Sequence, residues 1–199
     1  MAGPGRLAGR RPAGRTDRPP DAGIFRRRLK RPALSLSGVT ISDSSDAPTV
    51  DDRDPASLVP DAVDEILRLA ATWLAWDGAP RFGDGNAWTP HKALRRVVDH
   101  LLDHLAQIEA VLAGQPTVPD TWHGRAVTLD SDWARFTEAD LDEAASRLRR
   151  YALLYRIRLG ALSADELDRS RPQARTLRQI AHHVSGVTYY AEQVGALIS

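Results

Sequence analysis

The stretch that decides the fold is WTPHKALRRVVDHLLDHLAQI, residues 88–108. Its apolar residues recur at spacings of three and four, the period of an α-helix with one buried face. Thr89 is a good N-cap, Pro90 suits the first helical position, and Gly114 suits the end. The pattern predicts a helix over residues 90–113. Its buried stripe consists of Leu94, Val97, Val98, Leu101, Leu105, Ile108 and Leu112.

Three further segments have the same helical period, and no segment alternates convincingly as a strand would. They cover residues 60–77, 138–162 and 177–197. Thr176 with Gln179 forms a capping-box pair at the start of the last segment. Four amphipathic helices of this length predict an all-α fold, a four-helix bundle spanning residues 57–199.

The connections between these helices differ in character. Residues 78–87 form a glycine-rich loop. Residues 114–136 lack a clear period, although the sequence allows a short strand pair around residues 125–129. A connection this long is uncommon and often covers a functional site. We expect it to lie over the bundle near the site, with Trp122 and Trp133 as its apolar anchors.

The N-terminal residues differ in charge from the rest of the chain. Residues 1–33 carry a net charge of +8 and the remaining residues carry −7. We interpret residues 1–56 as a disordered basic head followed by an acidic linker, because they are rich in Gly, Pro and Arg without a hydrophobic period. The cluster Ile24–Pro32 could contact nucleic acid or anionic lipid, but a solvated basic tail or an over-long translation start is the favoured interpretation.

Composition excludes several classes of protein. The chain has no cysteine, which excludes disulfides, cysteine-based zinc sites and a cysteine nucleophile. No run of apolar residues is long enough to span a membrane. The acidic body has no basic helix face, which argues against nucleic-acid binding. We therefore expect a cytoplasmic protein with neither a nucleic acid nor a membrane as its partner.

Helix geometry sorts the six histidines. At 100° per residue, His100 and His104 lie on the edge of the buried stripe, one turn apart. His183 occupies the same kind of edge on the last helix, whereas His182 faces water. Histidines four residues apart on one helix commonly supply two zinc ligands, and a third from another helix leaves a position open. The alternative is that all three are half-buried, hydrogen-bonded histidines.

A family resemblance favours the metal interpretation. The segments Trp88–Ile108 and TLRQIAHHVSGVTYYAEQV, Thr176–Val194, resemble the DinB-like superfamily of bacterial four-helix bundles. In that family an H-x3-H pair, followed by Gln, shares a metal with one His of another helix. The matching residues here are His100, His104, Gln107 and His183, although the pair comes before the single His, which reverses the usual order.

The resemblance implies a metal-dependent enzyme with a small-molecule substrate. Its cofactor would be a divalent metal, zinc or nickel, and its activity that of an S-transferase or isomerase using an external thiol such as mycothiol. Hydrolysis by metal-bound water is a variant, and Tyr190 or His123 could orient the substrate. The alternative is a non-catalytic, metal-binding or structural bundle that forms a homodimer.

Overall fold

The computed structural model describes residues 53–119, 121–122, 124–171 and 175–197, and this part is mostly helical. The long helices are α1 (Pro55–Ala71), α2 (Pro90–Leu112) and α3 (Glu138–Gly160). The short helices are α4 (Ala164–Asp168), α5 (Leu177–Ser185) and α6 (Thr188–Glu192). Two 3₁₀ turns, η1 (Thr72–Ala75) and η2 (Asp130–Trp133), complete the helical elements. The predicted basic head lies outside the described residues, and so does the acidic linker apart from residues 53–56.

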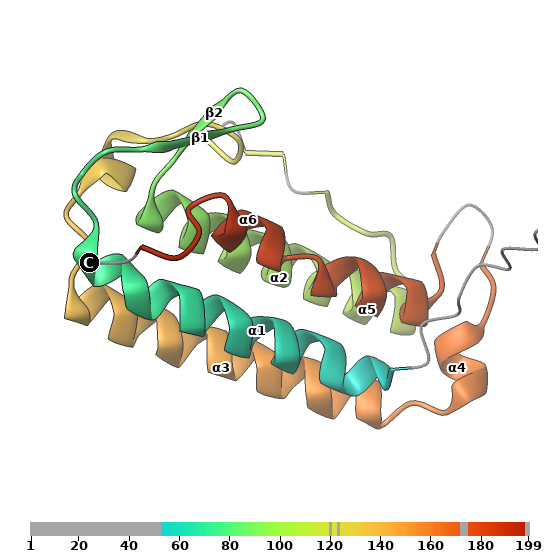
Figure 1. The fold of residues 1–199 in the computed structure, drawn as a ribbon. Coiled ribbons are helices and arrows are strands. Elements are labelled where there is room, and N and C mark those ends of the chain that lie inside the picture. Colours follow the sequence, from blue (N-terminus) through green and yellow to red (C-terminus); the bar gives the residue numbers. More distant parts are fainter. Residues whose placement is uncertain (1–52, 120, 123, 172–174, 198–199) are drawn as a thin grey trace, which may run out of the picture. The chain divides into compact units, whose positions relative to one another are not determined.

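The long helices lie nearly side by side. Helix α1 packs against α3, and α2 packs against α5 and α6 (Figure 1). Contacts of α1 with α5 and of α2 with α3 join these pairs around one apolar core. The largest fully buried apolar side chains are Trp73, Leu58, Ile66, Leu101, Ile108, Leu148, Leu159, Leu177 and Ile180. In the part of the chain that the structure describes, no helix is both long and apolar enough to cross a membrane.

Helix α1 begins earlier than the sequence pattern predicts. The side chain of Asp54 accepts a hydrogen bond from the backbone N–H of Ala56 at 3.0 Å and caps the helix. Pro60, the predicted start, therefore lies inside the helix. The regular helix ends at Ala71 and continues as the tighter turn η1, rather than running to residue 77.

The helix predicted over residues 177–197 is interrupted. The backbone N–H of Gly186 donates to the carbonyl of His183 at 3.2 Å, and that of Val187 donates to Val184 at 3.0 Å. These bonds span three residues instead of four, so the last turn of α5 tightens and the helix ends at Ser185. The chain resumes as α6, which carries the aromatic residues Tyr189 and Tyr190.

The glycine-rich loop contains a β-hairpin. Strands β1 (Arg81–Gly83) and β2 (Asn86–Trp88) pair antiparallel. The turn residues Asp84 and Gly85 have φ angles of 49° and 72°, and a two-residue hairpin turn favours Asp-Gly because both positions need positive φ. The strand pair that the sequence allows around residues 125–129 does not form.

Arg95 of α2 binds the long connection that follows this helix. Arg95 forms an ion pair with Asp132 at 2.6 Å and donates to the carbonyls of Gly124 at 3.0 Å and Val127 at 2.9 Å. The connection is thus held at the first turns of α2, and these contacts do not reach the later histidines. Trp122 and Trp133 remain 39% and 44% exposed, so they are weaker anchors than expected.

Two leucines of α3 provide a matched test of the core. Leu148 is fully buried and Leu153 is 54% exposed. We expect Leu148→Ala to lower the free energy of unfolding by about 2–5 kcal/mol, because it leaves a cavity in the core. Leu153→Ala should change it by no more than about 0.5 kcal/mol. Urea unfolding measures both values, and equal losses would contradict the described packing.

Candidate metal centre

Two histidines lie one turn apart on α2. His100 and His104 are half-buried at the edge of the apolar stripe, next to the fully buried Leu101. Their ring centroids are 4.5 Å apart. Side chains four residues apart project from the same side of a helix, so both rings reach the same space.

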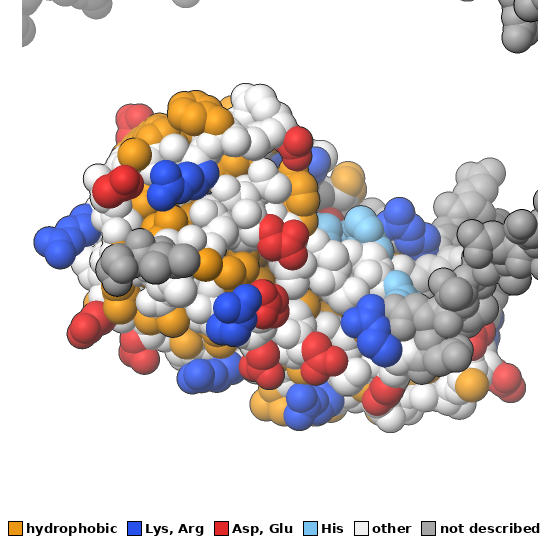
Figure 2. Space-filling model, viewed as in Figure 1, with side chains coloured by type: hydrophobic (Ala, Val, Ile, Leu, Met, Phe, Trp, Pro, Cys, Tyr) orange, Lys and Arg blue, Asp and Glu red, His pale blue; other side chains and the backbone are white. Residues whose placement is uncertain are grey.

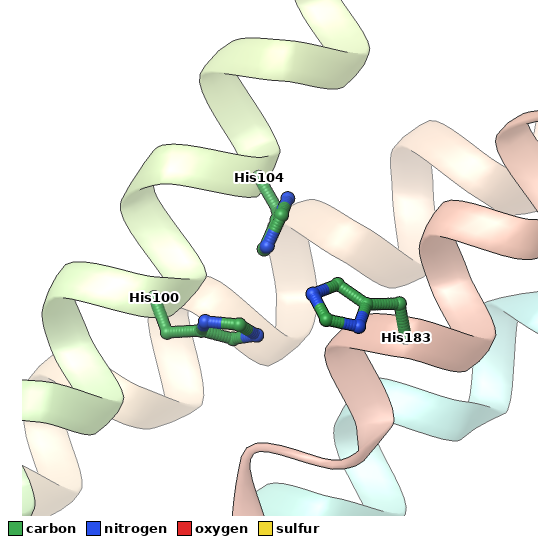
Figure 3. Close-up of side chains that lie close together, drawn as sticks. All are labelled: His100, His104 and His183. Atoms are coloured by element: carbon green, nitrogen blue, oxygen red, sulfur yellow. The ribbon is translucent and has the colours of Figure 1, made fainter. Parts of the chain in front are cut away.

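Helix α5 supplies the third histidine. The ring of His183 lies 5.2 Å from that of His100 and 4.8 Å from that of His104, measured between centroids. Figure 3 shows the three rings meeting in the space between α2 and α5. Neighbouring Val184 is fully buried in the core, and this fixes the rotation of α5 that leaves His183 at its edge. The three residues predicted from spacing therefore come together.

The donor atoms are close enough to consider one shared ion. One ring nitrogen from each histidine lies within 4.8 Å of the others. Zinc–nitrogen bonds of about 2.0–2.1 Å place donors about 3–4 Å apart, so the group must close slightly around an ion. Rotation of the three histidine side chains, with α2 and α5 kept in place, can bring the nitrogen atoms closer together. Among the described residues, no carboxylate belongs to this group.

One side of the histidine group faces solvent. His183 is exposed as a residue, although its ring points toward the other two histidines (Figure 3). Figure 2 shows histidine side chains reaching the surface on this face, with Lys or Arg side chains nearby. Three protein ligands and an open side are the arrangement of catalytic zinc sites, whereas structural sites are closed by a fourth protein ligand.

The surroundings of the group favour uncharged imidazole. Burial, together with the charges of His104, His183 and Arg96, lowers the pKa of His100 to about 3. Burial and the charges of His104 and Arg175 also lower the pKa of His183. A metal binds the neutral ring nitrogen, so His100 is in the ligand form well below neutral pH, and the lowered pKa of His183 favours its ligand form as well.

Gln107 orients His104. The Nδ1 atom of His104 lies 2.7 Å from Oε1 of Gln107. An amide oxygen can only accept a hydrogen bond, so Nδ1 carries the proton and Nε2 carries the lone pair. Metal-binding histidines generally donate their second N–H to such a partner, which fixes the ring. The glutamine that the family resemblance singles out thus has a physical role beside the predicted ligand.

The remaining histidines do not join the group. His91 packs on Phe136 with ring centroids 5.4 Å apart, and its Nε2 lies 4.0 Å from Asp140. His182, predicted to face water, is instead half-buried, and it is absent from the group. His123 lies outside the described residues.

Sequence reasoning overlooked Arg96. Its guanidinium lies 5.1 Å from the ring centroid of Tyr190, and its Nη2 lies 3.3 Å from the Tyr190 hydroxyl. The Tyr190 ring is in turn 5.7 Å from the ring of His100. The spacing of four residues between Arg96 and His100 was the available signal, since it places both on one edge of α2.

The centre is a surface site rather than a deep pocket. Cavities of about 360 and 560 Å³ lie between α2 and α3, and the three histidines do not line them. A ligand would therefore approach the histidines from solvent. Comparison of the chain with protein-family models, with curated proteins and with solved structures gives no match.

Adjacent histidines on α5 provide a test of the ligand set. We expect His183→Ala to lower zinc affinity sharply, because two ring nitrogens hold a divalent ion far less well than three. His182→Ala is the matched control and should leave the zinc stoichiometry at that of the unmodified chain. Elemental analysis after dialysis measures both. Loss of zinc from His182→Ala but not from His183→Ala would show that His182, and not His183, is the ligand on α5.

The lowered pKa of His100 predicts a dependence of stability on pH. Below about pH 6.5 His100 binds a proton in the unfolded chain, whereas in the folded chain its side chain stays neutral until about pH 3. Stability should therefore fall as the pH drops through this interval. In His100→Gln the free energy of unfolding should fall less steeply with decreasing pH, the slope being smaller by at most about 1.4 kcal/mol per pH unit. Urea unfolding with a chelator present tests this, and identical slopes would contradict it.

Proposed function

We propose that the chain is a metal-dependent enzyme in which His100, His104 and His183 hold one divalent ion, zinc or nickel. The observation that carries this proposal is the convergence of three imidazoles from two helices with one side open to solvent. The donor set fits such an ion, because neutral nitrogen ligands suit both metals. The hydrogen bond from His104 to Gln107 supports the same interpretation.

The proposed fold is a four-helix bundle of the DinB-like type. Helices α1, α2 and α3 would form three of its members, and α5 with α6 the interrupted fourth. Support comes from the packing of α1 on α3 and of α2 on α5 and α6. In this arrangement the site lies between the second helix and the first half of the fourth.

The proposed reaction is thiol-dependent transfer or isomerisation of a small molecule. A bound divalent ion would lower the pKa of a coordinated thiol and so supply a thiolate nucleophile. The thiol must be external, such as mycothiol, because the chain contains no cysteine. The cytoplasm, where thiols are kept reduced, suits this chemistry. The three histidines would hold the metal ion, and Gln107 would keep the His104 ring oriented.

A non-catalytic role is the second candidate. Leu102, Leu153, Leu154 and Ile157 are each about half exposed or more on α2 and α3. An exposed apolar surface of this kind suits contact with another protein surface. In this alternative the chain is a structural homodimer whose metal, if bound, only stabilises the fold.

Cobalt substitution separates the two candidates. We expect Co²⁺-loaded protein to develop a sulfur-to-metal charge-transfer band when 2-mercaptoethanol is added, because the open side admits a thiol ligand. The band should be missing in His183→Ala and retained in His182→Ala. Cobalt binding without any spectral response to thiol would overturn the thiol-dependent proposal and favour the non-catalytic alternative.

A further inference from the structure

An arginine and a tyrosine lie next to the three histidines. Arg96 is one turn before His100 on α2, and Tyr190 reaches the same edge from α6. The Tyr190 ring is 5.7 Å from the His100 ring, and the Arg96 guanidinium stands 5.1 Å from the Tyr190 ring centroid. The pair therefore belongs to the same surface as the histidine group but supplies none of its donor nitrogens.

The hydrogen bond between the two side chains has a defined direction. Nη2 of Arg96 lies 3.3 Å from the Tyr190 hydroxyl, and a guanidinium can only donate. The hydroxyl oxygen accepts this bond, so its own hydrogen is directed elsewhere. Tyr190 can therefore donate a hydrogen bond to a further acceptor.

The surrounding side chains hold the pair in place. Nη1 of Arg96 lies 3.6 Å from a carboxylate oxygen of Asp99, and the Arg96 side chain is only 11% exposed. Trp88 packs on Tyr190 with ring centroids 5.9 Å apart. These contacts restrict both side chains before any ligand arrives, which reduces the entropy lost when a ligand binds.

Positively charged side chains lie at both ends of the histidine group, although the Asp99 carboxylate offsets part of the charge of Arg96. Arg96 precedes His100 by one turn on α2, and Arg175 lies close enough to His183 for their charges to interact. Arginine is well suited to binding carboxylates, and its charge favours negatively charged groups even where a second side chain makes the direct contact. A ligand with a negative charge a few bonds from the atom that meets the histidines would fit next to these two arginines.

We infer that the Arg96–Tyr190 pair binds a carboxylate of the ligand, with the Tyr190 hydroxyl as the direct donor and Arg96 as the charge behind it. The inference deepens the proposed function and rests on it for the position of the ligand's other end. It narrows the substrate class to thiols, or thiol acceptors, that carry a carboxylate. Neutral thiols of the same length should bind less tightly.

Two probes of equal length test this inference on the full chain. The Co²⁺-loaded protein is titrated with 3-mercaptopropionate and with 3-mercaptopropan-1-ol, and the dissociation constants are read from the cobalt spectrum. We expect the carboxylate probe to bind about tenfold more tightly, as one charge-assisted hydrogen bond allows. Tyr190→Phe and Arg96→Met should bring the two constants close together.

Tyr189→Phe is the matched control. The hydroxyl of Tyr189 donates to Asp84 in the hairpin, so its removal should leave the preference for the carboxylate unchanged. If the carboxylate of 3-mercaptopropionate bound the cobalt ion itself, the preference for this probe would persist in every variant. Only a preference that Tyr190→Phe abolishes therefore supports binding by the Arg96–Tyr190 pair. A preference that survives both Tyr190→Phe and Arg96→Met would overturn the inference.

A metal-free arm separates this inference from the proposed function. Propionate and propionamide are titrated against the chelator-treated protein, and the ring resonances of His100 and Tyr190 are followed by NMR. A response to propionate that is lost in Tyr190→Phe supports the carboxylate site even if the protein takes up no cobalt. Equal responses to the two probes would overturn the site, while cobalt binding and the thiol band would still support the proposed function.

Discussion

The packing of α5 against α2 is the constraint on which the candidate site depends. Val184 and Ile180 are buried on α5, and Leu101 and Val97 are buried on α2. Burial of these apolar residues fixes the rotation of both helices. Each histidine of the group then sits at the boundary between core and solvent, where its ring is partly desolvated but still accessible. The same boundary position keeps His100 neutral and leaves room for a ligand.

The interruption after Ser185 has a second consequence. If α5 continued without a break, its helical period would set the direction of Tyr190. Instead, α5 ends at the tight turn at Gly186, and Tyr190 belongs to the separate helix α6. Tyr190 there packs on Trp88 of the hairpin and meets Arg96 of α2. Three elements thus meet beside the histidines.

The helices and the histidine group could be predicted largely from the sequence. The stripe and caps of α2 locate that helix within one residue, and edge positions counted at 100° per residue bring His100, His104 and His183 together. The break at Gly186 was missed because the apolar period continues through it. The hairpin was missed because its strands are too short to alternate, although Asp84-Gly85 is a recognisable turn pair. Contacts such as Arg96 with Tyr190 depend on packing between distant segments, which a periodic pattern does not contain.

The most direct measurement is X-ray diffraction from crystals grown with zinc, recorded above and below the zinc absorption edge. The account predicts one anomalous difference peak bonded to nitrogen atoms of His100, His104 and His183, at about 2.0–2.1 Å from each. The remaining coordination should be completed by solvent or an added thiol on the open side. A peak bound by other residues, or no peak between α2 and α5, would contradict the account.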